Sequence, residues 1–229
     1  MYFAKDYRDW ARTALGIKWT GNRWGTFVVI VLIYSLITGA VAAFGAYPFF
    51  AAIAGIGSLL IAGPFTLGLT SVSLNTVRGD QIKIEMLFGG FKDFTRAFVL
   101  MLLNSIFIFL WALLFIIPGI IKTYAYSMSF YILRDNPTMS ANDARKLSMQ
   151  MMHGNKWRLF CLQFSFIGWF LLGVLTLGIL LLWVIPYYKT AEACFYTSLI
   201  QPPKPVEKPE EELIEKPAEE QVEEPASDM

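Results

Sequence analysis

The chain has 229 residues, of which 55% are hydrophobic and 16% are charged, and its formal net charge is +1. A soluble domain of this length carries about a quarter of its residues as charged side chains, so the composition argues against a soluble globular protein. The two cysteines, Cys161 and Cys194, lie in apolar segments without CxxC spacing. Neither a disulfide framework nor a metal site is therefore expected.

The charges divide the chain into a basic body and an acidic tail. Residues 202–229 contain three lysines against ten acidic residues, a net charge of −7, whereas the preceding part has 16 basic and 8 acidic residues, a net charge of +8. A Pro- and Glu-rich segment cannot bury enough apolar surface to fold, so residues 202–229 are predicted to form a disordered cytoplasmic tail. This tail could bind a basic protein partner. Basic residues of the body alternate with apolar segments and therefore form no continuous basic surface. Nucleic-acid binding is not expected for this reason.

Six apolar segments follow a basic N-terminal segment, residues 1–24, which is predicted to lie at the cytoplasmic interface. A membrane-spanning helix needs roughly 20 mainly apolar residues. The segments form three hairpin-like pairs, at about 25–77, 97–133 and 157–200. The individual segments are about 25–44, 49–77, 97–117, 119–133, 157–172 and 176–200. The predicted fold is all-α: a polytopic membrane protein with a six-helix transmembrane domain at 25–200 and interfacial amphipathic helices.

The loops between these segments alternate in charge. The three hairpin turns carry no charged residue, whereas the N-terminal segment and the connections at 78–96 and 134–158 are rich in Lys and Arg. Positive charge gathers on the cytoplasmic side of membrane proteins. This pattern predicts six spans, a plasma-membrane location and cytoplasmic placement of both termini.

An internal repeat supports the same division of the chain. Residues 11–27 and 144–160 agree at seven positions at a fixed offset of 133 residues, counting one Arg/Lys pair, and residues 90–98 form a weaker middle copy. Each copy leads into the first helix of a hairpin, which predicts three hairpin repeats related by an axis along the membrane normal. Chance similarity between apolar segments is the alternative.

Two copies of this repeat place a tryptophan beside a basic residue where a span begins. Arg23 with Trp24, and Lys156 with Trp157, are predicted interfacial anchors, because a membrane interface favours an amphipathic ring and a cation that reaches the headgroups. Ser140 and Asp143 predict a capped helix through Met152 that lies along the cytoplasmic interface.

Polar residues inside the apolar segments are the candidate functional residues. Lys122 lies 12 residues before Arg134, about 18 Å along a helix, and therefore near the middle of a hydrocarbon core of about 30 Å. Lys189 reaches a similar depth, and Glu192 follows it at i+3 on the same helix face. Placing a charged side chain near the middle of the membrane costs at least about 2.5 kcal/mol, and such a side chain normally faces the interior of the helix bundle. Residues that could complete a polar interior are Asn104, Tyr124, Tyr126, Gln163, Tyr187 and Tyr188.

These buried charges allow two interpretations. Lys122, Lys189, Glu192 and Tyr126 could form an intramembrane site for an anionic group, such as a lipid phosphate, a peptide carboxylate or a small solute. Alternatively, the charges could be satisfied by hydrogen bonds between helices and serve packing alone.

No motif indicates an enzyme. The sequence has no HExxH, GxSxG, P-loop or dinucleotide-binding pattern. The single histidine, His153, follows Met149, Met151 and Met152. A copper site would use such residues, but methionines on the apolar face of an interfacial helix explain them more simply. No catalytic residue, cofactor or metal is therefore predicted.

Several motifs together resemble a known family. They are Ile117-Pro118-Gly119-Ile120-Ile121-Lys122, Tyr124-Ala125-Tyr126-Ser127-Met128, Asp135-Asn136-Pro137, Met151-Met152-His153-Gly154-Asn155-Lys156-Trp157-Arg158-Leu159-Phe160, Phe166-Ile167-Gly168-Trp169 and Trp183-Val184-Ile185-Pro186-Tyr187. With Gly63-Pro64 and Arg78-Gly79, they resemble an uncharacterised bacterial integral membrane family, a domain of unknown function common in Gram-positive bacteria. The resemblance implies a plasma-membrane protein of helical spans and brings no activity.

Two functions follow as hypotheses. The first is an integral membrane protein that contacts membrane lipids and binds or passes a small or lipidic ligand at a polar centre of its helices. The alternative is a scaffold or accessory protein, for envelope stress or peptide immunity, that acts through its cytoplasmic loops and tail.

Overall fold

The structure is a computed structural model that describes residues 3–16, 22–47 and 49–200. Within these residues the chain is all-helical, as predicted, and contains no strand. The predicted tail at 202–229 and part of the predicted N-terminal segment lie outside the described residues. The helices are α1 (Ala4–Leu15), α2 (Asn22–Gly45), α3 (Ala51–Arg78), α4 (Glu85–Gly89), α5 (Phe94–Leu114), α6 (Ile116–Tyr126), α7 (Ser129–Asp135), α8 (Ala141–Met151), α9 (Lys156–Phe164), α10 (Ile167–Leu175) and α11 (Leu181–Ile200).

Four helices in the described part of the chain are long and apolar enough to cross a membrane. They span Arg23–Gly45, Ala51–Arg78, Phe94–Leu114 and Lys156–Leu175, the last of which combines α9 and α10. The predicted fourth segment is divided between α6 and α7, because the helix is interrupted at residues 127–128. Of the predicted sixth segment, residues 181–200 form the continuous helix α11, which buries the polar side chains of Thr190 and Glu192 near its middle. Four apolar helices are thus established, and the count of six is not.

The middle hairpin turns earlier than the sequence predicted. Phe115, with extended backbone, separates α5 from α6, whereas Pro118 lies inside the first turn of α6. Proline is tolerated there because the first N–H groups of a helix have no partner within the helix. A Cβ on Gly119 would lie 2.8 Å from the Cα of Ala112. Glycine at this position therefore lets the two helices of the hairpin approach closely.

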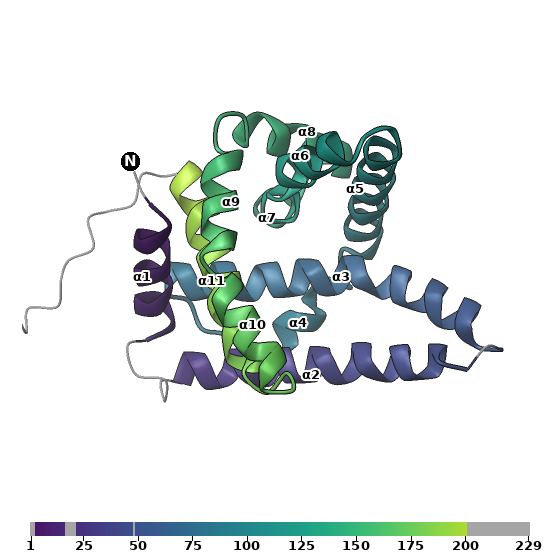
Figure 1. Cartoon of the computed structure of the whole chain (residues 1–229), viewed down its shortest axis with the longest axis horizontal. Helices are drawn as coiled ribbons and strands as arrows, with labels where there is room; N and C mark the ends of the chain where they lie inside the picture. Colours follow the sequence, from purple (N-terminus) through teal and green to yellow (C-terminus); the bar gives the residue numbers. More distant parts are fainter. Residues whose placement is uncertain (1–2, 17–21, 48, 201–229) are drawn as a thin grey trace, which may run out of the picture.

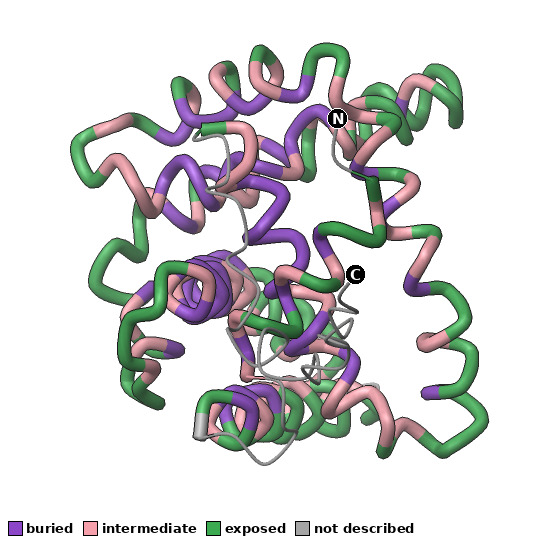
Figure 2. The backbone as a smooth tube through the Cα atoms, turned by 90° about the vertical axis from the view of Figure 1, so that its left-hand side faces the viewer, coloured by how far each residue is buried: buried purple, intermediate pink, exposed green. Residues whose placement is uncertain are grey.

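Two helices organise the interior. Helix α3 packs against α2, α4, α5, α7 and α11, and α11 also packs against α1, α2 and α10. One continuous apolar core runs through these contacts, and Figure 2 shows buried residues gathered in the middle of the molecule with exposed residues around its periphery. Helix α8 is capped at its start by Ser140, whose hydroxyl accepts a hydrogen bond from the backbone N–H of Asp143. This start confirms the predicted cap, and α8 packs on α5, α6 and α7.

The hairpins do not run parallel to one another. In Figure 1, α2 and α3 lie side by side across the view, whereas α9, α10 and α11 run down it. The turn end of each hairpin exposes large apolar side chains: Phe49 is 83% exposed, Ile116 75% and Leu177 94%. Soluble monomers rarely expose apolar surface on this scale.

Candidate functional site

The structure joins Lys189 and Glu192 within one polar cluster, and Glu192 is its centre. One carboxylate oxygen of Glu192 accepts from Lys189 Nζ at 2.9 Å, and the other accepts from Tyr188 Oη at 2.7 Å and Gln163 Nε2 at 3.4 Å. Tyr124 Oη in turn donates to Gln163 Oε1 at 2.9 Å. Helices α6, α9 and α11 therefore meet through one chain of hydrogen bonds. The ion pair neutralises the lysine, which disfavours binding of an isolated anion by Lys189 alone.

A cavity of about 330 Å³ lies against this cluster. Its polar lining consists of Tyr124, Gln163 and Tyr188, the same residues that connect to Glu192. Its apolar walls are Phe160, Phe164, Ile167 and Phe170. We call this cavity the α9–α10 groove. Most of the apolar side chains in its wall are exposed, with Phe164 at 62%, so the groove is open at the outer surface of the protein.

The other two predicted site residues lie elsewhere. Lys122 lies over the ring of Trp111, with Nζ 4.9 Å from the ring centroid. Tyr126 is buried beside Arg145, whose Nη1 donates to the tyrosine hydroxyl at 3.5 Å. The guanidinium of Arg145 also stacks on Phe107 at 3.9 Å. The four predicted residues are therefore divided among three separate environments, and only Lys189 and Glu192 touch each other.

The predicted interfacial anchors also take different places. Trp24 is only 4% exposed and donates from Nε1 to the carbonyl of Gly16 at 3.1 Å, so it lies inside the protein. Arg23 donates to the carbonyls of Ala14 and Gly79 at the ends of α1 and α3. Trp157 is 70% exposed and stacks on Phe160, next to the partly exposed Lys156. Only this second pair has the outward position that an anchor requires.

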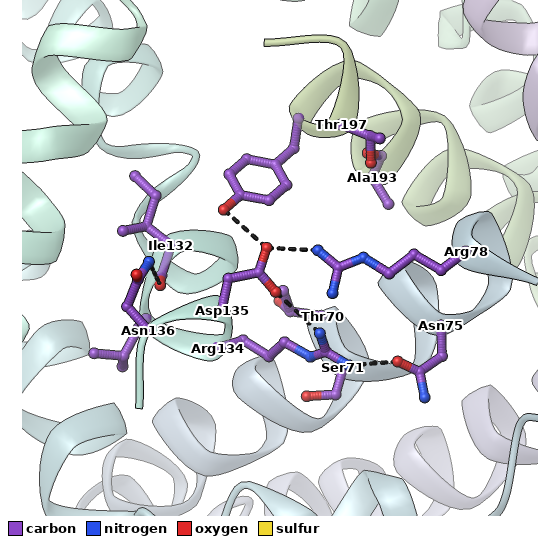
Figure 3. A network of polar contacts seen from close by, with 12 residues as sticks. Thr70, Ser71, Asn75, Arg78, Ile132, Arg134, Asp135, Asn136, Ala193 and Thr197 are labelled. Atoms are coloured by element: carbon purple, nitrogen blue, oxygen red, sulfur yellow. Dashed lines mark hydrogen bonds and ion pairs between the residues drawn. The ribbon is translucent and has the colours of Figure 1, made fainter. Parts of the chain in front are cut away.

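A second polar cluster, which the sequence interpretation missed, joins the ends of α3, α7 and α11 (Figure 3). Asp135 accepts from Arg78 Nη2 at 2.6 Å, from Arg134 Nη1 at 2.9 Å and from Tyr196 Oη at 3.2 Å. Arg134 also donates to the side-chain oxygen of Asn75. The available signal was a charged residue at the end of the second helix in the first two hairpins, in Arg78-Gly79-Asp80 and Arg134-Asp135-Asn136.

The environment of Asp135 favours its ionised form. Burial would by itself raise the pKa of this carboxyl, but the hydrogen bonds and positive charges of Arg78 and Arg134 outweigh it and hold the pKa below its ordinary value of 3.8. Asp135 therefore carries its negative charge at neutral pH and holds two arginines together. This arrangement suits a structural connection between helices.

The described part of the chain is thus all-helical, with four helices of membrane-spanning length and the polar clusters around Glu192 and Asp135. In the described residues no group of three or more His, Cys, Asp or Glu side chains could hold a metal ion. The chain belongs to a family described as a protein of unknown function, DUF975, whose model matches residues 1–123 and 114–202. This match confirms the resemblance found in the sequence. No curated protein and no solved structure matched the chain.

Proposed function

We propose that this protein is a six-pass plasma-membrane protein with both termini in the cytoplasm. The four apolar helices account for four passes, and the remaining two are residues 116–133, which cover α6 and the apolar part of α7, and helix α11. Each of these pairs with the apolar helix before it, since α6 packs on α5 and α11 on α10. Basic residues are concentrated in the connections that would all face the cytoplasm. The exposed apolar turn ends are then covered by lipid.

Packing between the three hairpin units supports the proposed repeat. The units are α1–α3, α4–α7 and α8–α11, and each begins with a short helix. The first helix of each unit packs on the last part of another unit: α1 on α11, α4 on α3, and α8 on α6 and α7. Through these contacts each of the three units packs on the next, and the three form a closed ring, as a threefold arrangement requires. The splayed hairpins leave grooves between them.

Within this framework, the proposed function is the binding of a lipidic ligand in the α9–α10 groove. The observation that carries it is a cavity with a hydrogen-bonded polar floor and an exposed aromatic wall. An amphipathic molecule would place its polar head against Tyr124, Gln163 and Tyr188 and its chain along the phenylalanines. Because Lys189 and Glu192 neutralise each other, an uncharged or zwitterionic head fits this floor better than a lone anion. Tyr124, Gln163 and Tyr188 already take part in hydrogen bonds within the protein, which favours a binding role over a catalytic one.

Lipid retention tests the proposal. Wild-type protein extracted in mild detergent should carry a lipidic species enriched over bulk membrane lipid, detected by mass spectrometry. Gln163→Leu should reduce that enrichment about tenfold, because the loss of one hydrogen bond to a polar head corresponds to roughly 1.4 kcal/mol. Gln150→Leu, at an exposed position on α8 outside the groove, is the matched control and should retain the species. Absence of any enriched species from the wild-type protein would overturn the proposal.

Two further variants separate binding from the alternatives. Lys189→Met leaves Glu192 without its ionic partner, so loss of the protein from the membrane would indicate a packing role, whereas normal levels without bound lipid would indicate a site. Deletion of residues 202–229 should leave lipid retention unchanged. If the deletion abolishes partner capture and the wild-type protein retains no specific lipid, the chain acts as a scaffold.

A further inference from the structure

The short helix α4 is held rigidly against α3. A Cβ on Gly68 would lie 2.1 Å from the carbonyl oxygen of Leu87, and a Cβ on Gly90 would lie 2.0 Å from the carbonyl oxygen of Pro64. Only glycine allows the two backbones to approach this closely. Leu87 is fully buried at this contact. The segment around α4 is therefore fixed in place despite its five-residue length.

The segment from Lys83 to Lys92 exposes both apolar and basic side chains. Ile84, Phe88 and Phe91 are 41%, 44% and 37% exposed, and both phenylalanines also make edge contacts with Phe65. Lys83 and Lys92 are exposed on either side of α4 and form no ion pair within the described part of the chain. Apolar side chains flanked by lysines are typical of a segment that enters the headgroup region of a membrane.

A cavity of about 320 Å³ lies between these lysines. Lys83 and Lys92 line it together with Arg134 and the single acidic residue Glu85, so its four charged residues have a net charge of +2. Arg134 is held in position by its bonds to Asp135 and Asn75. The cavity therefore has two lysines that form no ion pair in the described residues and one arginine that is paired with Asp135. We call it the α4 basic cavity.

We propose that the α4 basic cavity binds the phosphate headgroup of an anionic phospholipid, whose acyl chains lie along Ile84, Phe88 and Phe91. The two lysines without an ion pair, with Arg134 beside them, match a phosphodiester, and the exposed apolar residues of the same segment favour a lipid over a free phosphate. This site rests on membrane insertion, which belongs to the proposed function, but it is independent of the α9–α10 groove. It would place anionic lipid at the junction of α3, α4 and α7.

The test compares two short-chain lipids on the full-length protein in neutral detergent, with binding measured by native mass spectrometry. Dioctanoyl phosphatidylglycerol should bind more tightly than dioctanoyl phosphatidylcholine. The double variant Lys83→Gln/Lys92→Gln should weaken phosphatidylglycerol binding by about 30-fold, from about 1 kcal/mol per lysine near an anionic lipid. The matched control Lys5→Gln/Lys146→Gln removes two exposed lysines elsewhere and should change binding less than about twofold.

Glu85→Gln provides a test in the opposite direction. Removal of the acidic residue from the cavity should strengthen phosphatidylglycerol binding by about three- to fivefold, and this exposed position should not affect folding. Equal loss in both lysine double variants, or equal wild-type affinity for the two lipids, would overturn the proposal. Comparable affinity for glycerol phosphate alone would assign the cavity to a soluble phosphate compound instead. Gln163→Leu should keep the phosphatidylglycerol preference, so failure of the groove and failure of this cavity are distinguishable.

Discussion

The two best copies of the repeat, residues 11–27 and 144–160, place matching residues in different environments. Ala11 and Ala144 are both completely buried, on α1 and α8. Trp24 is 4% exposed, whereas Trp157 is 70% exposed. The difference arises from the neighbours, because Trp24 packs near Tyr187 of α11 and Trp157 stacks on Phe160 of its own helix. The matching alanines thus keep the same role in helix contact, while the matching tryptophans differ with their neighbours.

The matching arginines show the opposite contrast. The side chain of Arg12 is 58% exposed and lies over the ring of Tyr187, with a long ion pair of 3.9 Å to Asp9. Arg145 is 8% exposed and lies between Phe107 and Tyr126. Of the matching tryptophan and arginine, each copy therefore buries one and exposes the other. The copy at residues 11–27 buries its tryptophan, and the copy at residues 144–160 buries its arginine.

Substitution of the two tryptophans should give the largest difference between the copies. Trp24→Ala should lower the free energy of unfolding by about 3–4 kcal/mol, because it leaves a cavity in the core. Trp157→Ala should lower it by less than about 0.5 kcal/mol, because its ring is mostly exposed. Thermal unfolding of purified protein in detergent measures both. Equal losses would mean that the two copies have the same environment, contrary to the structure.

The next effect concerns the Asp135 cluster, whose residues lie outside both copies of the repeat. Asp135→Asn should cost about 2–3 kcal/mol at pH 7, because two arginines lose their ionic partner. Since the pKa of Asp135 lies below its ordinary 3.8 in the folded protein, its stabilisation is complete above that pH and disappears as the pH falls through the folded value.

The unfolding midpoints of the wild type and of Asp135→Asn should therefore converge only in strong acid. Unfolding measured from pH 7 down into strong acid in one detergent provides the comparison. A gap between the two proteins that widens as the pH falls would contradict the assigned direction of the pKa shift. Asp93→Asn, at a half-exposed carboxyl with a 3.6 Å ion pair, is the control and should leave the midpoint nearly unchanged.

Substitution of the matching arginines, Arg12 and Arg145, should give the smallest of the three differences in stability. Arg145→Met should cost about 1–2 kcal/mol, because it removes a desolvated cation–π contact and the hydrogen bond to Asn142. Arg12→Met should cost less than about 0.5 kcal/mol, as expected for an exposed charge. Urea titration of the two variants resolves this difference. A larger loss from Arg12→Met would reverse the contrast between the copies.

Much of the helical plan could be predicted from hydropathy and local signals. The apolar segments at 25–44, 49–77 and 97–117 correspond to α2, α3 and α5, and the cap at Ser140 begins α8. The division of the predicted fourth segment at residues 127–128 could not be predicted, because α6 and α7 have no proline or glycine between them. That interruption accompanies packing of α7 on α3 and α8.

The candidate site was predictable only where its residues lie close in sequence. Lys189 and Glu192 form the expected i+3 pair, because that spacing puts both side chains on one face of a helix. Lys122 instead lies over the ring of Trp111. The similar membrane depth expected for Lys122 and Lys189 therefore did not bring the two lysines together. Asp135 was missed because its partners Arg78 and Tyr196 are 57 and 61 residues away along the chain.

The sequence by itself determined the apolar segments, the alternation of basic and uncharged connections, and the family. These properties depend on composition and on spacing within a single helix. Only the tertiary structure decided which tryptophan is buried, which arginine stacks inside, and which polar residues meet in the groove and around Asp135. Such contacts join helices that are distant in the chain, so they depend on how the hairpins cross and on which backbones glycine allows to approach.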